Sequence, residues 1–219
     1  MKHLLVMAKA PVAGRVKTRL CPPCSPEEAA AVAAAALADT LEAVAGCAAD
    51  RKIVALAGRP GPSLRAHLES AGVEVIAQRG ATFADRLAHA WSDAGPIGVQ
   101  IGMDTPQVTT AELDDLLTLL PDRPEPVAVL GHAPDGGWWA LGLAGADPSV
   151  AFAGIPMSTP VTGRLQEERL ATLGLRVVHA PVRRDIDTIE DLLAVAATMA
   201  PRSHTRALVD TLTLDEQVA

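Results

Sequence analysis

Residues 97–106 read Ile-Gly-Val-Gln-Ile-Gly-Met-Asp-Thr-Pro, and this stretch decides the class of fold. Its first six residues form a short, mainly apolar run that ends in turn-forming residues, which predicts a buried β-strand. Strands of this kind are typical of a parallel sheet that is covered on both faces. In such sheets ligands bind at the carboxyl ends of the strands, and Asp104 follows this strand directly. The stretch therefore indicates both an architecture and one edge of a functional site.

The same pattern continues on both sides of this stretch. Further strands are expected at residues 4–7, 52–57, 73–76, 126–130, 138–143 and 176–179. Helices are expected at residues 26–44, 63–71, 82–91, 110–120, 160–173 and 189–199. Capping boxes at Ser25–Glu28 and Thr109–Glu112 begin two of these helices, so both glutamates are interpreted as caps and not as catalysts. In the helix at 82–91, one face carries Phe83, Leu87 and Ala90.

Alternating short strands and helices predict an α/β fold, a three-layer sandwich around a mostly parallel sheet. The strand at 138–143 follows its neighbour too closely for a helical crossover, so the sheet is expected to be mixed. We expect one domain over residues 1–200. The polar tail over residues 201–219 is expected to be loose.

Composition excludes several classes of protein. The 219 residues carry 19 Lys and Arg against 26 Asp and Glu, a net charge of −7. Net acidity argues against a nucleic-acid partner, because phosphate backbones are bound mainly by cations. Two Phe, three Trp and no Tyr leave few rings for stacking on single strands, and Trp91 is expected to belong to the core.

Membrane and redox functions are not expected either. No apolar run approaches the ~20 residues of a bilayer span, and the five apolar residues before Lys9 are shorter than a signal-peptide core of roughly 7–15. A cytoplasmic protein without membrane contact is expected. Three cysteines exclude a disulfide framework. Cys21 and Cys24 have redox-motif spacing, but they follow a basic loop, which favours an accident of composition.

A basic loop follows the first expected strand, at residues 9–20. Residues 1–26 hold five basic side chains and no acidic one, which is unusual in a chain of net negative charge. Gly14 permits a tight turn, and Lys9, Arg15, Lys17 and Arg19 suit phosphate oxygens, with Thr18 among them. The loop is not a Walker A motif, since Val16 stands where that motif needs glycine. The alternative is a solvated basic loop.

Carboxylates follow two expected strands. Asp104 could hold a divalent ion beside a nucleotide, or could simply begin a turn. Asp185 and Asp187 are two residues apart on an extended segment, so they point the same way and could share one Mg²⁺ ion. Alternatively, Asp187 caps the last helix in a box with Glu190.

Asp135, Gly136, Gly137 and Trp138 form a further candidate. The glycines could form a floor beneath a ligand with an indole wall, or the segment could be a tight connection. The neighbouring His132 is interpreted as a loop histidine without a catalytic role. Arg86 follows a loop that contains Gly80 and could reach a bound nucleotide.

Five motifs in chain order resemble those of the DUF2064 family, the "transferase 1, rSAM/selenodomain-associated" proteins. They are Lys9-x-Pro11-x-x-Gly14-x-x-Lys17-Thr18-Arg19-Leu20, Gly102-x-Asp104-x-Pro106, Ala133-x-Asp135-Gly136-Gly137-Trp138, Ser158-Thr159-Pro160 and Asp185-x-Asp187-Thr188-x-x-Asp191-Leu192. Trp138 stands where the family has Tyr, and Met157 where it usually has Trp.

The resemblance implies the nucleotide-diphospho-sugar transferase (GT-A) fold, and a more distant likeness to 2-phospholactate guanylyltransferase. It implies Mg²⁺, or Mn²⁺, held by Asp104, Asp185 and Asp187. Two reactions with a small-molecule acceptor fit. One is nucleotidyl transfer from a nucleoside triphosphate, with Lys17, Arg19 and Arg15 on its phosphates, and it is favoured by the number of cations. The other is glycosyl transfer from an NDP-sugar, with Asp135 as the candidate base. A non-catalytic nucleotide-binding module is the third interpretation.

Overall fold

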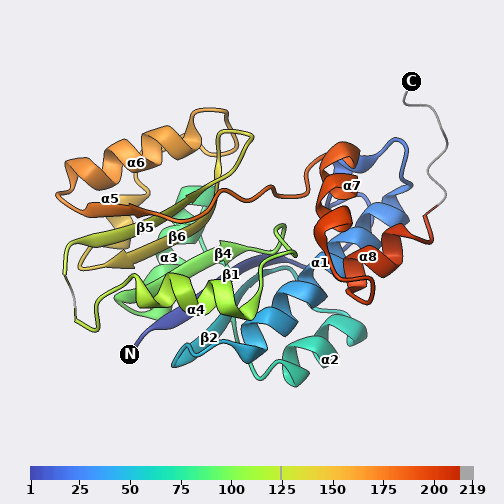
Figure 1. Ribbon diagram of the computed structural model, residues 1–219, viewed down its shortest axis with the longest axis horizontal. Coiled ribbons are helices and arrows are strands. Elements are labelled where there is room, and N and C mark those ends of the chain that lie inside the picture. The colour runs from blue at the N-terminus through green and yellow to red at the C-terminus, as the bar shows by residue number, and fades with distance from the viewer. Residues whose placement is uncertain (124, 213–219) are drawn as a thin grey trace.

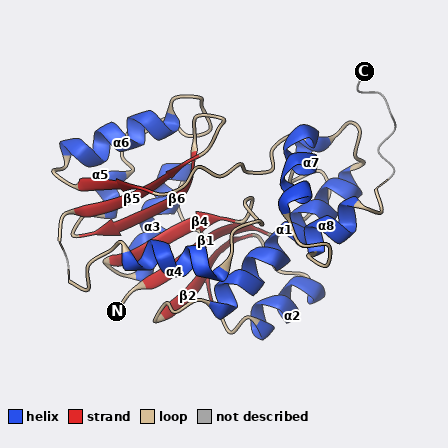
Figure 2. Ribbon diagram, viewed as in Figure 1, coloured by secondary structure: helices blue, strands red, loops and turns tan. Residues whose placement is uncertain are grey.

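The computed structural model describes residues 1–123 and 125–212, and it shows a seven-stranded sheet between two layers of helices (Figures 1 and 2). The strand order is β3-β2-β1-β4-β6-β5-β7. Strand β6 is antiparallel to its neighbours β4 and β5, and the other pairs are parallel. The strands are β1 (His3–Lys9), β2 (Arg51–Ala57), β3 (Glu74–Ala77), β4 (Ile97–Gly102), β5 (Val127–His132), β6 (Trp138–Ala144) and β7 (Arg176–His179). The predicted mixed, mostly parallel sheet is confirmed.

Helices cover both faces of this sheet. One layer comprises α1 (Pro26–Gly46), α2 (Pro62–Ser70) and α4 (Thr110–Thr118), which share one hydrophobic cluster with the strands. The other comprises α3 (Phe83–Ala94), α5 (Pro148–Ala151) and α6 (Thr162–Thr172), which share a second cluster. Beyond the sheet, the 3₁₀ turn η1 (Thr18–Leu20) and helices α7 (Ile189–Thr198) and α8 (His204–Val209) pack on α1. The predicted three-layer sandwich is therefore confirmed.

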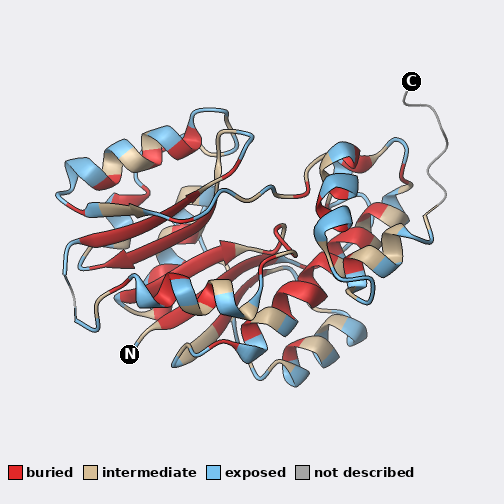
Figure 3. Ribbon diagram, viewed as in Figure 1, coloured by how far each residue is buried: buried red, intermediate tan, exposed pale blue. Residues whose placement is uncertain are grey.

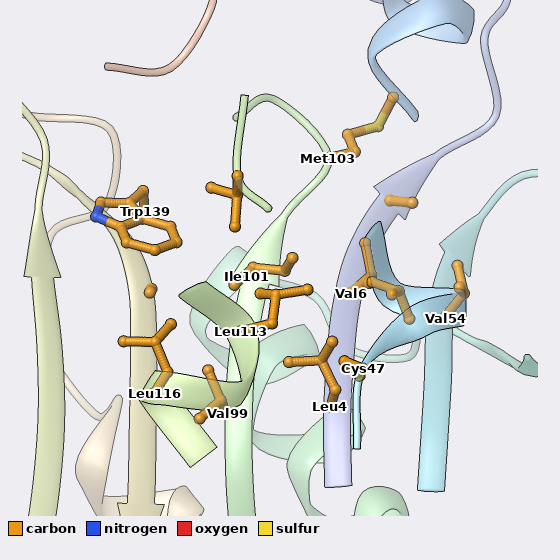
Figure 4. Close-up of a cluster of buried hydrophobic side chains, with 14 of the residues drawn as sticks. Leu4, Val6, Cys47, Val54, Val99, Ile101, Met103, Leu113, Leu116 and Trp139 are labelled. Atoms are coloured by element: carbon orange, nitrogen blue, oxygen red, sulfur yellow. The ribbon is translucent and has the colours of Figure 1, made fainter. Parts of the chain in front are cut away.

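Strand β1 shows why an unbroken apolar run becomes a central strand. Side chains of successive residues point to opposite faces, so Leu4 and Val6 enter the first cluster while Leu5 and Met7 enter the second. Figure 4 shows Leu4 and Val6 beside side chains of β4 and α4. Trp91 is 1% exposed and donates its indole N–H to Gln100 on β4, at 2.8 Å, as expected of a core tryptophan.

Helix α1 begins with the predicted capping box between Ser25 and Glu28. By length and composition this helix is apolar enough to cross a bilayer. The sequence did not indicate this, because small and polar residues interrupt its apolar runs. Yet 56% of the most apolar 18-residue stretch of α1 is buried inside the protein. Its Leu37 and Leu41 pack under the sheet, which is the arrangement of a core helix.

Two sequence expectations are wrong. The tail was expected to be loose from residue 201, but Ser203 caps α8, and Asp39 of α1 accepts backbone N–H groups from His204 and Thr205 at 2.7 and 2.8 Å. Residues 213–219 of that predicted tail lie outside the described residues. Phe83 was expected on one apolar face with Leu87 and Ala90, but it stands in the first turn of α3 and is 40% exposed. Figure 3 shows that burial is concentrated in the strands of the sheet.

Candidate functional site

The basic loop turns back on itself after β1. Gly14 has φ +71° and Lys17 has φ +49°, a left-handed conformation that costs a residue with a β-carbon about 1–2 kcal/mol. This turn directs the Lys17 side chain inward, where it is only 7% exposed. Its Nζ lies 2.6 Å from Asp104 and 3.6 Å from Asp187, and it donates to the carbonyl of Ile186. Such strain is typical of functional sites, where surrounding contacts sustain it.

Asp104 and the segment at 185–187 meet as the sheet topology predicts. Ile186 is fully buried, and its N–H donates to the Asp104 carbonyl at 2.8 Å, which joins the two segments. The helix after them is capped by Thr188, in a box with Asp191. The alternative that Asp187 caps this helix with Glu190 is therefore wrong. The Asp187 carboxylate instead faces Lys17 and Arg19, the latter at 3.2 Å.

Three carboxylates converge beside these ion pairs. Oxygens of Asp135, Asp185 and Asp187 all lie within 4.8 Å of one another. Burial, together with the charges of Asp135, Asp187 and Asp104, raises the pKa of Asp185 to about 6. A local excess of negative charge of this kind favours a bound cation, and carboxylate oxygens are the ligands that Mg²⁺ and Mn²⁺ prefer. We call these three residues the carboxylate cluster.

The carboxylate cluster differs in one member from the predicted metal set. Asp104 contributes to the electrostatic field at Asp185, but it is not one of the three residues whose oxygens all lie within 4.8 Å of one another. Asp135, which was predicted as a base, is the third member of the cluster, and a metal-binding role of Asp104 stays a prediction. Its Oδ1 accepts the Gly137 N–H at 2.8 Å, so the turn between β5 and β6 fixes the carboxylate.

A pocket of about 260 Å³ lies against this cluster. Four cations contribute to its wall, and Asp187 belongs both to the pocket and to the carboxylate cluster. The lining residues are Lys9, Arg15, Val16, Lys17, Thr18, Arg19, Ala33, Met103, Asp104 and Asp187. The Lys9 ammonium donates to the Arg15 carbonyl at 2.6 Å, while no ion pair is found for Arg15 in the described part of the chain. We call this cavity the basic pocket.

The segment at Gly136 and Gly137 packs closely against another part of the chain, at Pro160. Gly136 has φ +88°, and a β-carbon there would collide with the carbonyl of Pro160, so a floor left open for a ligand is not what the structure shows at this residue. Trp138 stacks on Phe152 in the second hydrophobic cluster, with ring centroids 6.4 Å apart. Its indole nitrogen is buried and has no hydrogen-bond partner among residues 1–123 and 125–212. A ligand contact by Gly136, Gly137 or Trp138 stays a prediction.

Arg86 is a predicted site residue that does not line the basic pocket. It lies on α3 with its guanidinium 5.4 Å from the centre of the Phe83 ring. Sequence reasoning also missed the residues that fix the 183–187 segment. Arg183 pairs with Glu112, and Arg184 donates to Asp191 at 2.7 Å. The two arginines directly before Asp185 were the feature of the sequence that could have indicated these ion pairs. Glu112 is a cap, as predicted, and an ion-pair partner as well.

The fold belongs to a known structural class. The structure is similar to a candidate nucleotide-diphospho-sugar transferase from Desulfovibrio desulfuricans G20, at 25% identity and a TM-score of 0.82, over 96% of this chain and 95% of that chain. It is also similar to a CMP:2-keto-3-deoxy-manno-octonic acid synthetase complexed with CTP, at 14% identity and a TM-score of 0.57, over 97% and 100% of the chains. A third similar structure is Rv0371c from Mycobacterium tuberculosis H37Rv in complex with manganese, at 19% identity and a TM-score of 0.51, over 89% and 98%.

Residues 29–159 match the family described as "uncharacterized protein conserved in bacteria (DUF2064)", and the chain belongs to that family. The predicted family is thus confirmed, as is the nucleotide-diphospho-sugar transferase fold. The motifs at residues 9–20 and 185–192 lie outside the matched range. No curated protein matches the chain.

Proposed function

We propose that this protein is a metal-dependent nucleotidyltransferase, which joins a nucleoside monophosphate from an NTP to a small phosphorylated acceptor and releases pyrophosphate. The observation that carries the proposal is the contact between the basic pocket and the carboxylate cluster through Asp187. An array of cations beside a set of carboxylates suits a polyphosphate that is bound together with a divalent ion.

The carboxylate cluster fits such an ion by its chemistry. Asp135, Asp185 and Asp187 offer hard oxygen donors, and the raised pKa of Asp185 reports a local excess of negative charge. A similar fold has been solved with manganese, which is consistent with this assignment. When bound there, Mg²⁺ or Mn²⁺ would supply neutralisation of phosphate charge.

The residues of the basic pocket position the polyphosphate. Arg15 and Arg19 are exposed and could pair with phosphate oxygens in a bidentate manner, as guanidinium groups do. Lys9 and Thr18 add an ammonium and a hydroxyl at the rim. Lys17 lies between the pocket and the acidic side chains, held by Asp104 and Asp187. Because Lys17 is held by Asp104 and Asp187 before the substrate arrives, it can stabilise developing charge on the leaving phosphates with little reorganisation.

Glycosyl transfer from an NDP-sugar is the second candidate. The Desulfovibrio desulfuricans G20 protein, to which this chain is 25% identical, is described as a candidate nucleotide-diphospho-sugar transferase. In that reaction Asp135, exposed on its turn, would face the sugar as a base. Four cations in the basic pocket favour the triphosphate, which carries one more phosphate than the donor sugar nucleotide.

A thermal-shift panel tests these functions. We expect one of the four NTPs, with Mg²⁺, to raise the melting temperature, because ligands that bind only the folded state stabilise it by mass action. Arg19→Ala should reduce this shift, and Arg176→Ala, an exposed arginine at the start of β7, is the matched control. Pyrophosphate release on addition of phosphorylated acceptors would then identify the acceptor.

Each other outcome of the panel has a definite meaning. A larger shift with an NDP-sugar than with its parent NTP would replace nucleotidyl transfer by glycosyl transfer. Binding of an NTP that is unchanged by EDTA and by Arg19→Ala would contradict the proposed site altogether. Binding without turnover of any acceptor would favour the non-catalytic module.

A further inference from the structure

Two histidines and a glutamate from three different elements form a second group of potential ligands, separate from the carboxylate cluster. His132 ends β5, His179 ends β7, and Glu167 lies on α6. The Nε2 atom of His132 is 3.0 Å from Oε2 of Glu167, and the Nε2 atom of His179 is 2.9 Å from Oε1. One donor atom from each residue lies within 4.8 Å of the other two. We propose that these three side chains form a binding site for Zn²⁺ or a similar borderline divalent metal.

The spacing of the three donors suits a tetrahedral ion. Zinc binds imidazole nitrogen and carboxylate oxygen at about 2.0–2.2 Å, which separates two ligand atoms of a tetrahedron by about 3.4 Å. The two nitrogen–oxygen separations here, each to a different oxygen of Glu167, are shorter by only a few tenths of an ångström. Rotation of the side chains would therefore convert the hydrogen bonds into ligand bonds, with loss of the protons on the two nitrogens.

The chemistry of the donors separates this site from the carboxylate cluster. Imidazole nitrogen selects zinc and later transition metals, whereas a site built from carboxylates alone suits magnesium or manganese. The side chains of His132, Glu167 and His179 are 31%, 36% and 57% exposed, so an ion can enter and water can complete its coordination. Two histidines, one glutamate and a water form a known composition of zinc sites.

The site would connect both loops that carry the carboxylate cluster. His132 precedes Asp135 by three residues, and a register shift at Gly131 and His132 marks the end of regular pairing there. The carbonyl of His132 accepts the Arg183 N–H at 3.3 Å, just before Asp185. A metal on His132 and His179 would therefore fix the origins of the 133–137 and 180–187 segments against α6. Its binding does not depend on the proposed function.

The third cluster of potential ligands provides the matched control. Asp39, Glu42 and His204 also lie within ligand distance of one another. The two oxygens of Asp39, however, already accept the backbone N–H groups that begin α8. Substitution of His204 thus removes a histidine whose exposure, 41%, lies between those of His132 and His179, without touching the proposed site.

The experiment titrates metal-stripped, full-length protein with Co²⁺, followed by visible absorbance, and then displaces the Co²⁺ with Zn²⁺. We expect one equivalent to bind with the intense bands of a four-coordinate ion in the wild type, in His204→Ala and in Asp185→Asn. His179→Ala and Glu167→Gln should each weaken binding at least about tenfold, with far-UV circular dichroism unchanged.

Three outcomes would overturn the proposal. The first is a wild type that binds no Co²⁺ or Zn²⁺ above the level of His179→Ala. The second is equal loss of binding in His204→Ala. The third is thiolate-to-cobalt charge-transfer absorbance that disappears in Cys21→Ser, which would place the ion at the cysteines. Any of these would leave His132, Glu167 and His179 as a hydrogen-bonded network without metal.

Discussion

Removal of the charge of Asp185 should make the metal-free protein more stable. Burial and the charges of Asp135, Asp187 and Asp104 raise the pKa of Asp185 from 3.8 to about 6. Asp185→Asn keeps the shape of the side chain and removes its charge. The variant should therefore gain stability at neutral pH while it loses the ability to hold Mg²⁺.

The magnitude and its pH dependence follow from linkage. Because the pKa of Asp185 is higher in the folded chain, its contribution to stability is full below about pH 4 and is lost as the pH rises through about 6. A difference of about two pKa units corresponds to at most about 3 kcal/mol at pH 7.5. In a chain of this length that raises the melting temperature by roughly 5–10 °C.

Urea unfolding in EDTA, at pH 7.5 and pH 4.0, measures this difference. The gain from Asp185→Asn should shrink to less than about 1 kcal/mol at pH 4.0. Asp104→Asn and Asp187→Asn are the controls: both carboxylates are paired with Lys17, so neither variant should gain stability. Equal stability of Asp185→Asn and the wild type at pH 7.5, or an undiminished gain at pH 4.0, would show that the charge of Asp185 does not destabilise the fold.

Three further predictions concern stability. Burial lowers the pKa of His3 from 6.5 to about 4. The free energy of unfolding of the wild type should therefore fall by about 3 kcal/mol relative to that of His3→Phe between pH 7 and pH 4, as measured by urea unfolding. Parallel pH profiles of the two proteins would contradict this. Gly136→Ala should be clearly less stable than Gly14→Ala in thermal melts, because only Gly136 meets a neighbouring carbonyl, that of Pro160. Thr188→Ala should cost about 1 kcal/mol through loss of the cap of α7, and an unchanged unfolding midpoint would count against that cap.

Much of the fold could be predicted because its signals are local. Strands β1 and β4 are short apolar runs that end in turn residues, and the boxes at Ser25 and Thr109 mark helix starts directly. Helix α8 could not be predicted in this way. It is short and polar, and its stability comes from Asp39 on α1, more than 160 residues earlier in the chain.

The part of the site that lies at the ends of the parallel strands could be predicted from the sequence. Asp104, Asp187 and Lys17 meet because parallel strands end at one edge of the sheet. The place of Asp135 in the carboxylate cluster depends on the antiparallel β5–β6 turn, and the inward Lys17 depends on a left-handed backbone that a lysine rarely adopts.

Contacts between side chains from different elements could not be predicted from the sequence. His132, Glu167 and His179 are separated by 35 and 12 residues and come from three elements, so no spacing rule connects them. Arg86 shows the reverse case. Its position after a glycine-containing loop suggested a contact with a bound nucleotide. The helical periodicity of α3 instead directs its side chain over the ring of Phe83.

The central claim is that the basic pocket and the carboxylate cluster form one nucleotide site. The measurement that tests it most directly is calorimetric titration of the preferred NTP into wild type and Asp185→Asn, each with Mg²⁺ and with EDTA. If the two parts act together, Mg²⁺ should strengthen binding to the wild type at least about tenfold and should leave Asp185→Asn unchanged. Equal affinity with Mg²⁺ and with EDTA in the wild type, or an equal Mg²⁺ effect in the variant, would contradict the claim.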